Sequence, residues 1–379
     1  MARRVAATLL LLAARGAAER CEAERAVHAF YYLWYGTPEI DGKWLHWDHK
    51  VLPHWTAAVR AKYKHLHNHS YQPPDDLHSR FRPARGAYSS RDPATLDAHF
   101  AQMRAAGVDA AVLSWTGRPG GAVSDTQGVS TDSAAGDALA AAARIGMGAA
   151  IHLEPYEGRS PSSVRDDLGY LVARYPSLYT LPRRPCGDEP RLPVVYVYDA
   201  YHNAPEAWAE VLCPGGAKTI RGTDRDVVAL ATLLGPEDKD LVERGCFDGA
   251  YSYFATDGFT HGSSSRHWAA LATWARDKNL WFSPSAGPGY DDTKIRPWNG
   301  GATRGRGGGA YYERMLGAAA SSGPTLLSIT SFNEWGEGTQ IEPSVDYGDG
   351  GPDLYLTITR QVGDAWRAGV VAAEGAGEL

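Results

Sequence analysis

Short apolar runs alternate with amphipathic segments along most of this chain, and that alternation constrains the fold more than any other feature. Runs rich in β-branched and aromatic residues predict strands that are buried on both faces. About eight such runs, each followed by a helical segment, predict a parallel sheet closed into a barrel, so the expected fold class is α/β, a (β/α)8 TIM barrel in a single domain. The predicted strands are residues 27–34, 110–115, 149–153, 193–198, 218–221, 250–254, 280–284 and 326–332, with the weakest pattern at 218–221.

The predicted helix that opens at Asp92 shows the helical pattern most clearly. Asp92 is a suitable cap, Pro93 suits the first helical position, and Leu96, Phe100 and Met103 recur on one face up to residue 107. Similar patterns predict further helices over residues 133–145, 162–175, 205–212, 236–244, 265–278 and 310–321.

Charge and aromatic content narrow the class of ligand. The net charge of -6 and the isoelectric point near 6.1 provide no basic surface, so we expect no nucleic-acid partner. The 12 Trp and 20 Tyr exceed what a core of this size needs, so some rings should line a cleft. Amphipathic rings suit polar, hydroxyl-rich ligands such as sugars.

The first residues combine a basic start, a short apolar stretch and small residues. This resembles a secretory signal peptide or a weak signal anchor, which we assign to residues 1–24, because the stretch falls short of the ~20 residues that span a bilayer. Residues 25–379 would then form the barrel domain, and membrane contact would come only through the leader. The four cysteines, Cys21, Cys186, Cys213 and Cys246, allow one structural disulfide in an oxidising compartment.

Two other motifs suggest metal or phosphate binding only weakly. His65, His67 and His69 alternate on an extended segment, but such exposed histidines are usually incidental. The glycine-rich residues 300–309 lack the Gly-Lys-Ser/Thr ending of a phosphate loop and predict a mobile loop. We therefore expect no metal and no cofactor.

Polar and aromatic side chains follow nearly every predicted strand, at the barrel end where active sites lie. The last strand delivers Asn333, Glu334 and Glu337 where Gly336 and Gly338 let the chain turn. Glycoside hydrolysis needs two carboxyl groups, one protonated and one ionised, and Trp335 between them could supply a sugar-stacking wall. The alternative is a surface turn with two solvated acids. The long segment 35–93, rich in Trp and His, should build one wall of the site.

With these residues assembled, the sequence resembles glycoside hydrolase family 99, the endo-α-1,2-mannosidases, which are (β/α)8 barrels. The resemblance runs over nearly the whole chain past the leader. The matching segments are FYYLWYG (residues 30–36), QPPDD (72–76), YSSRDP (88–93), LSW (113–115), HLEPY (152–156), VYDAY (197–201), YFATDGFTHGSS (253–264), SAGPGYDDTKIRPWN (285–299) and ITSFNEWGEGTQIEP (329–343).

The resemblance implies that Glu337 is the general acid/base and that Glu334 is its partner, a base on the sugar 2-hydroxyl. The 2-oxygen would attack the anomeric carbon to form a 1,2-anhydro sugar, with net retention. Arg296 near the two acids would hold Glu334 ionised, while burial would keep Glu337 protonated. The positions that the resemblance places around the sugar on the non-reducing side are His152, Glu154, Tyr198, Tyr253, Arg296, Trp298 and Asn333.

Two departures from the family pattern concern specificity. Gly336 stands where relatives often carry a larger residue such as His, and the loop at residues 116–130 is glycine-rich. The function implied by the resemblance is a monomeric, retaining endo-α-1,2-mannosidase in the Golgi lumen that acts on a glucosylated high-mannose N-glycan. The alternatives are an endo-α-1,2-mannanase on mannan polysaccharide, a non-catalytic carbohydrate-binding barrel, and, for location, a secreted protein.

Overall fold

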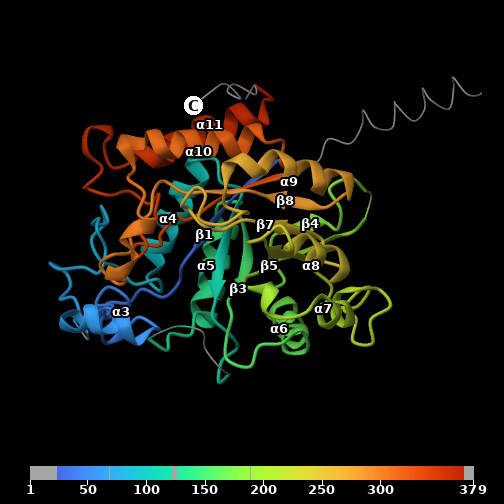
Figure 1. Ribbon diagram of the computed structural model, residues 1–379, viewed down its shortest axis with the longest axis horizontal. Coiled ribbons are helices and arrows are strands. Elements are labelled where there is room, and N and C mark those ends of the chain that lie inside the picture. The colour runs from blue at the N-terminus through green and yellow to red at the C-terminus, as the bar shows by residue number, and fades with distance from the viewer. Residues whose placement is uncertain (1–23, 68, 122–124, 126, 188, 371–379) are drawn as a thin grey trace, which may run out of the picture.

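The strands of this chain form a barrel, surrounded by helices (Figure 1). The computed structural model describes residues 24–67, 69–121, 125, 127–187 and 189–370, so the leader assigned to residues 1–24 lies outside the described residues except for Glu24. Nine parallel strands run in the order β8-β7-β6-β5-β3-β2-β1-β10-β9. Their bounds are β1 Ala26–Tyr31, β2 Ala110–Trp115, β3 Gly148–Leu153, β5 Arg191–Val197, β6 Val228–Thr232, β7 Gly249–Tyr251, β8 Trp281–Ser283, β9 Ser285–Ala286 and β10 Leu326–Ile329.

The barrel closes where β8 and β9 follow one another in the chain. β8 pairs with β7 on one side, β9 pairs with β10 on the other, and only Pro284 separates the two strands. β8 and β9 therefore share one position in the barrel, and β10 pairs with β1. The predicted (β/α)8 barrel is confirmed. The short strand β4, Thr180–Pro182, lies antiparallel to β5 outside this order.

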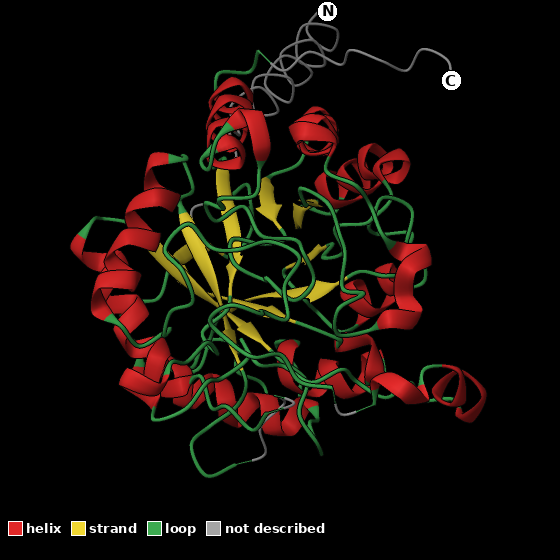
Figure 2. Cartoon of the chain, turned by 90° about the vertical axis from the view of Figure 1, so that its left-hand side faces the viewer, coloured by secondary structure: helices red, strands yellow, loops and turns green. Residues whose placement is uncertain are grey.

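Eight long helices ring the described strands, as the end-on view of Figure 2 shows. Asp92 caps the first of them by accepting a hydrogen bond from Ala94 N, as predicted. The last one, α11, was missed by the sequence prediction, although it packs against both α10 and α4 and so closes the ring. The helices are α4 Pro93–Ala105, α5 Asp132–Arg144, α6 Pro161–Arg174, α7 Pro205–Leu212, α8 Asp238–Arg244, α9 Ser265–Asp277, α10 Ala310–Ser321 and α11 Leu354–Arg367.

The fifth strand was predicted at the wrong place. Residues 218–221 lie in a loop, and the strand is β6, Val228–Thr232. Arg221 explains the difference, because its buried guanidinium donates hydrogen bonds to the main-chain oxygens of Leu212 and Val227. The apolar run VALAT in β6 was the signal that the prediction overlooked.

Side chains alternate between two buried layers along each strand, as the pleat requires. In β1, Val27 and Ala29 pack outward against the helices, whereas Phe30 points into the barrel. Tyr196 and Tyr251 also fill the interior, each about 5–6 Å from the Phe30 ring centroid. The interior therefore mixes aromatic rings with aliphatic side chains such as Val112 and Leu230.

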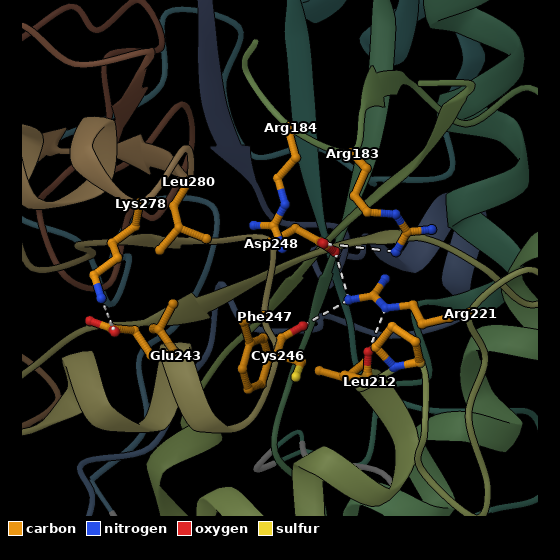
Figure 3. A pocket seen from close by; sticks show the side chains of 12 residues that line it. Arg183, Arg184, Leu212, Arg221, Glu243, Cys246, Phe247, Asp248, Lys278 and Leu280 are labelled. Carbon is orange, nitrogen blue, oxygen red and sulfur yellow. Dashed lines mark hydrogen bonds and ion pairs between the residues drawn. The ribbon is translucent and has the colours of Figure 1, made fainter. Parts of the chain in front are cut away.

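A cavity of about 420 Å³ lies near the starts of β7 and β8, at the amino-terminal end of the barrel (Figure 3). Arg183 and Arg221 point at the fully buried Asp248, and Arg221 Nη2 lies 3.0 Å from its carboxylate. Cys246, which also lines this cavity, is bonded to Cys213, so the predicted structural disulfide is present. The ion pairs and the disulfide join β6, β7 and the ends of α7 and α8.

Candidate active site

The segment after β10 forms a compact loop at the carboxyl-terminal end of the barrel. Ser331 N donates to Thr339 O at 2.8 Å, so the loop folds back on itself. Gly338 adopts a left-handed conformation (φ 63°), which favours glycine. Arg306 supports the loop from behind, because its Nη2 donates to the main-chain oxygens of Gly338 and Gln340 at 2.9 Å each. The glycine-rich segment 300–309, predicted as a mobile loop, thus contains a buried anchor.

Glu334 is buried within this loop, with 5% of its surface exposed. Its main-chain N donates to Ser331 Oγ at 2.7 Å, and its Oε1 accepts from Gly336 N at 3.1 Å. Trp335 does not provide the expected sugar-stacking wall, because its indole is fully buried and its Nε1 donates to Glu342 Oε2 at 2.9 Å. That expectation is wrong: the indole packs behind the loop instead of facing the cleft.

Glu337 reaches the cleft from the same loop and contacts a cation. Arg296 Nη1 lies 3.2 Å from Glu337 Oε1 and 3.0 Å from Asp292 Oδ2. Asp292 is fully buried, and Asn299 Nδ2 donates to its Oδ2 at 3.0 Å. Asp291 N donates to Glu337 O at 2.9 Å, which ties the segment after β9 to the loop after β10. One guanidinium therefore stands between two acids.

Burial raises the pKa of both carboxyls, Glu334 and Glu337. For Glu334 burial raises the pKa well above its ordinary value, and the charge of Glu337 adds to this effect, while Arg296 and the Gly336 N–H oppose it. For Glu337 burial raises the pKa and Arg296 opposes the rise, while Asp292 contributes to it. A proton is therefore held within the pair at pH values where an ordinary glutamate would have lost it.

The expected division of charge between the two acids is supported only in part, because Arg296 lowers the pKa of Glu334 as expected but burial outweighs this effect. We expected Arg296 to hold Glu334 ionised, but its guanidinium contacts Glu337 directly. That contact favours the charged form of Glu337 and leaves the proton on Glu334. The reason is tertiary, because the segment that carries Arg296 approaches the loop from the Glu337 side.

Aromatic and polar side chains at the strand ends line up beside the acid pair. His152, at the end of β3, contacts Glu154 Oε1 through Nδ1 at 3.0 Å and Tyr251 OH through Nε2 at 2.9 Å. Its ring stacks on Tyr253 at 5.6 Å, and Tyr198 lies 5.0 Å from Tyr253. These rings present hydroxyl groups and an imidazole toward the acids, an arrangement suited to a sugar ring.

A cavity of about 210 Å³ is lined by Glu154, Arg296, Glu334 and Glu337. His152, Tyr198 and Tyr253 do not line this cavity themselves, but His152 contacts Glu154, and the charge of Glu337 contributes to the raised pKa values of both tyrosines, so all three lie beside the acid pair. The structure therefore brings together the acid pair and the predicted binding residues His152, Glu154, Tyr198, Tyr253 and Arg296.

Asn333 and Trp298 were also predicted to bind sugar, and in the structure their side chains contact other protein groups. Asn333 is fully buried; its Oδ1 accepts from Tyr32 N at 2.7 Å and its Nδ2 donates to Tyr32 O at 2.9 Å. It therefore joins the end of β10 to the end of β1. Trp298 lies on the short helix η3, Pro297–Ala302, where its ring contacts His54 and Tyr63 outside the cavity.

Residues from two loops complete the cavity and were not predicted individually. His46, His49 and His78 come from the connection between β1 and α4, which confirms that segment 35–93 builds one wall. Asp125 comes from the loop after β2, and its Oδ1 lies 2.6 Å from His46 Nε2. The ring of His46 stacks on Trp34 at 4.5 Å. The histidine-rich composition of segment 35–93 was the signal available.

Gly336 leaves room for one of these histidines. A Cβ atom at this position would lie 2.9 Å from His78 Nε2 and 3.2 Å from Glu334 Oε1. His78 is buried, and burial together with His49 and His46 lowers its pKa well below the ordinary value, so the imidazole is neutral. The ring of His78 thus stands where a side chain at position 336 would begin.

The cavity's donors do not form a metal site. Among residues 24–67, 69–121, 125, 127–187 and 189–370, no three His, Cys, Asp or Glu side chains are grouped so that they could hold a metal ion.

Two carboxyl groups with raised pKa values, facing a cleft lined by tryptophan and histidine rings, meet the requirements of acid-assisted glycosidic cleavage, and the chain is a glycoside hydrolase. Residues 22–368 match the sequence pattern of glycosyl hydrolase family 99, and the chain belongs to that family.

Relatives of known name span most of the chain. It is 44% identical over 349 residues to the glycoprotein endo-alpha-1,2-mannosidase of Rattus norvegicus, covering 88% of this chain and 73% of the relative. It is 42% identical over 346 residues to a glycoprotein endo-alpha-1,2-mannosidase-like protein of Danio rerio, covering 88% and 77%. The GH99 endo-alpha-mannosidase of Bacteroides thetaiotaomicron superposes with a TM-score of 0.78 at 35% identity, covering 90% of this chain and 97% of that structure.

Proposed function

We propose that this enzyme is a retaining endo-α-1,2-mannosidase that cleaves the α-1,2-mannosidic bond next to a glucose-substituted mannose in high-mannose N-glycans. The observation that carries the proposal is the pairing of Glu334 and Glu337 across the cleft after β10. The names of the rat and frog relatives, both glycoprotein endo-alpha-1,2-mannosidases, support the linkage and the substrate class.

In the first step Glu334 takes the proton of the mannose 2-hydroxyl, and the 2-oxygen attacks the anomeric carbon. Glu337 gives its proton to the departing glycosidic oxygen, so the bond breaks and a 1,2-anhydro sugar forms. Mannose suits this route because its axial 2-hydroxyl can stand anti to an α-linked leaving group. Because both carboxyls are held beside the bound sugar, the proton transfers need no separate encounter with an acid or base from solution, and the activation barrier of bond cleavage is lower.

Substrate binding must place the proton correctly within the acid pair. The direct contact of Arg296 with Glu337 favours charge on Glu337, whereas the first step needs charge on Glu334. A sugar 2-hydroxyl that donates to Glu334 favours its charged form, and a glycosidic oxygen that accepts from Glu337 favours its protonated form. We infer that the substrate itself selects the reactive arrangement, so the proton is in place only when a sugar is bound.

In the second step water opens the anhydro sugar. Glu337, now a carboxylate, takes a proton from the water as its oxygen attacks the anomeric carbon, and Glu334 returns a proton to the 2-oxygen. Two inversions give net retention, and the enzyme ends in its starting state.

We also propose that the enzyme works in the secretory pathway, in the Golgi lumen if the leader is kept as an anchor. The disulfide between Cys213 and Cys246 supports an oxidising compartment. Within the part of the chain that the structure describes, no helix combines the length and apolar character needed to cross a membrane.

The test is mass spectrometry of the products from a monoglucosylated high-mannose N-glycan and, in parallel, from an α-mannan polysaccharide. Protein beginning at residue 22 is compared with its Glu337→Gln variant. Release of a glucosyl-mannose disaccharide by the wild type alone is the expected result. Cleavage of the mannan but not the N-glycan would replace the proposed substrate, and two intact substrates would indicate a carbohydrate-binding barrel.

A further inference from the structure

An indole at the rim of the cleft is unusually exposed. Trp55 exposes 78% of its surface, more than any other large apolar side chain in the part of the chain that the structure describes. Single exposed apolar residues are common on protein surfaces and need no function. Trp55 differs because its ring is held in place: it stacks on the imidazole of His54 with 3.8 Å between centroids and 27° between planes.

His54 is itself fixed by its neighbours. It is buried, with 8% of its surface exposed, and its Nδ1 accepts hydrogen bonds from Thr56 N at 3.0 Å and Thr56 Oγ1 at 2.9 Å. The ring of Trp298 meets it edge to face at 5.3 Å, and Tyr63 contacts Trp298 in turn at 6.3 Å. We call Trp55, His54, Trp298 and Tyr63 the rim platform.

The rim platform continues from the catalytic cavity. Leu52 N donates to Ile295 O at 2.9 Å, so the segments 52–55 and 295–298 are joined at the cavity wall. Leu52, Ile295 and Arg296 line the cavity together with the acid pair. Two residues further along each segment stand His54 and Trp298. A chain of sugars that leaves the cavity along these segments would therefore meet the rim platform.

We propose that the rim platform is a binding site for sugar residues of the substrate beyond the glucose and the two mannoses at the cleaved bond. An endo-acting enzyme binds a chain that continues past that bond, and the apolar face of a pyranose ring packs well on an exposed indole. Rings held in one orientation lose little conformational entropy on binding. This inference rests on the proposed function, because it assumes that the cavity holds the cleaved bond of an oligosaccharide.

The platform also explains the position of Trp298. Sequence resemblance assigned this residue to the sugar next to the cleaved bond, but the cavity lining does not include it. Its contact with His54 and its partial exposure place it on the rim instead. It would support Trp55 and His54 and contact the outer sugars.

The experiment compares Trp55→Ala, Trp55→Phe and the wild type on two substrates. One is a full high-mannose N-glycan, and the other is a short glucosyl-mannosyl-mannose that spans only the cleaved bond. Loss of one stacking ring should raise KM for the full glycan by about three- to tenfold, leave kcat unchanged and leave both constants unchanged for the short substrate. Trp55→Phe should keep most of the affinity. Phe259→Ala is the control, since Phe259 is another exposed ring (53%) that meets Phe254 edge to face and has no part in this platform.

A direct measurement of binding separates this inference from the proposed function. Calorimetric titration of the full glycan into Glu337→Gln protein, with and without Trp55→Ala, should show the same three- to tenfold loss of affinity. If the wild type cleaves the glycan and Trp55→Ala changes neither KM nor this affinity, the platform is not a sugar site. An equal loss of kcat on both substrates would also overturn the inference, because it would indicate a disturbed cleft. If the wild type cleaves neither substrate, the proposed function fails first.

Discussion

Acidic side chains are buried at both ends of this barrel, but they are balanced by arginines at only one end. At the amino-terminal end Arg183 and Arg221 each contact both Asp226 and Asp248. Figure 3 shows the two arginines beside Asp248. At the carboxyl-terminal end Glu334, Glu337 and Asp292 lie around the single guanidinium of Arg296 among the residues described.

The comparison indicates that the buried acids at one end of the barrel stabilise the fold, whereas those at the other end are suited to proton transfer. Removing one partner from a buried ion pair lowers the free energy of unfolding strongly, because the other charge is left buried without compensation. The amino-terminal cluster therefore holds β6, β7 and two loops together. A buried acid pair with too little positive charge keeps a proton at pH values where an ordinary glutamate has lost it, and a proton that can be given and taken back is what glycosidic cleavage requires. The charge ratio thus distinguishes the two clusters, although both are buried.

The largest loss of activity should follow replacement of either acid of the Glu334–Glu337 pair. Glu337→Gln and Glu334→Gln should each lower kcat by about 10³-fold or more, because general acid or base assistance is lost from the step that breaks the bond. The measurement is disaccharide release followed by mass spectrometry. Residual activity within tenfold of the wild type would remove that residue from the mechanism.

Stability should respond in the opposite direction at this end of the barrel. A carboxyl whose pKa is raised in the folded state, as for Glu334, destabilises the fold at pH values above its ordinary unfolded pKa, where unfolding releases it to ionise in water. Glu334→Gln should therefore leave the melting temperature unchanged or higher at neutral pH, and any gain should disappear as the pH falls below that ordinary value. A clear loss of stability at neutral pH would contradict this account.

At the amino-terminal end the same kind of change should cost stability instead of activity. Arg221→Met leaves Asp226 and Asp248 short of a partner and should lower the free energy of unfolding by about 3–5 kcal/mol. Urea denaturation measures the loss, and kcat per folded molecule should stay at the wild-type value. Arg360→Met is the matched control, because its exposed pair with Asp364 should be worth only about 0.5 kcal/mol.

Replacing Arg296 by an uncharged residue should shift the dependence of kcat/KM on pH. Arg296 lowers the pKa values of both Glu334 and Glu337, so Arg296→Met should raise both. The whole profile of kcat/KM against pH should then move to higher pH by about one unit, together with a higher KM. An unchanged profile would show that Arg296 binds substrate without setting the charge of the pair.

The smallest expected effect concerns the space beside Glu334. Gly336→Ala should lower kcat by about three- to tenfold, because the new Cβ would lie 2.9 Å from His78 Nε2 and displace either that ring or Glu334. Adding His78→Gly to the same chain should recover part of the loss, since it empties the contested space. Identical kinetics for Gly336→Ala and the wild type would mean that His78 has room to move.

Much of the fold was predictable because strand and helix periods are local properties of sequence. The runs at 110–115 and 310–321 agree with β2 and with α10, Ala310–Ser321. The fifth strand was misplaced because a buried arginine contacts acids from the following loop and strand, and no short window of sequence contains that pairing. The helix α11 was missed although it closes the ring of helices.

The sequence by itself determined the barrel, the end of the barrel that carries the chemistry, and the two glutamates, since periodicity and spacing along one segment suffice for these. Only the tertiary structure decided that Arg296 contacts Glu337 instead of Glu334, that Asn333 bonds to the main chain of Tyr32, and that Trp298 packs against His54. The physical reason is that a side chain's partners come from loops distant in sequence, and the direction in which it points depends on how those loops pack.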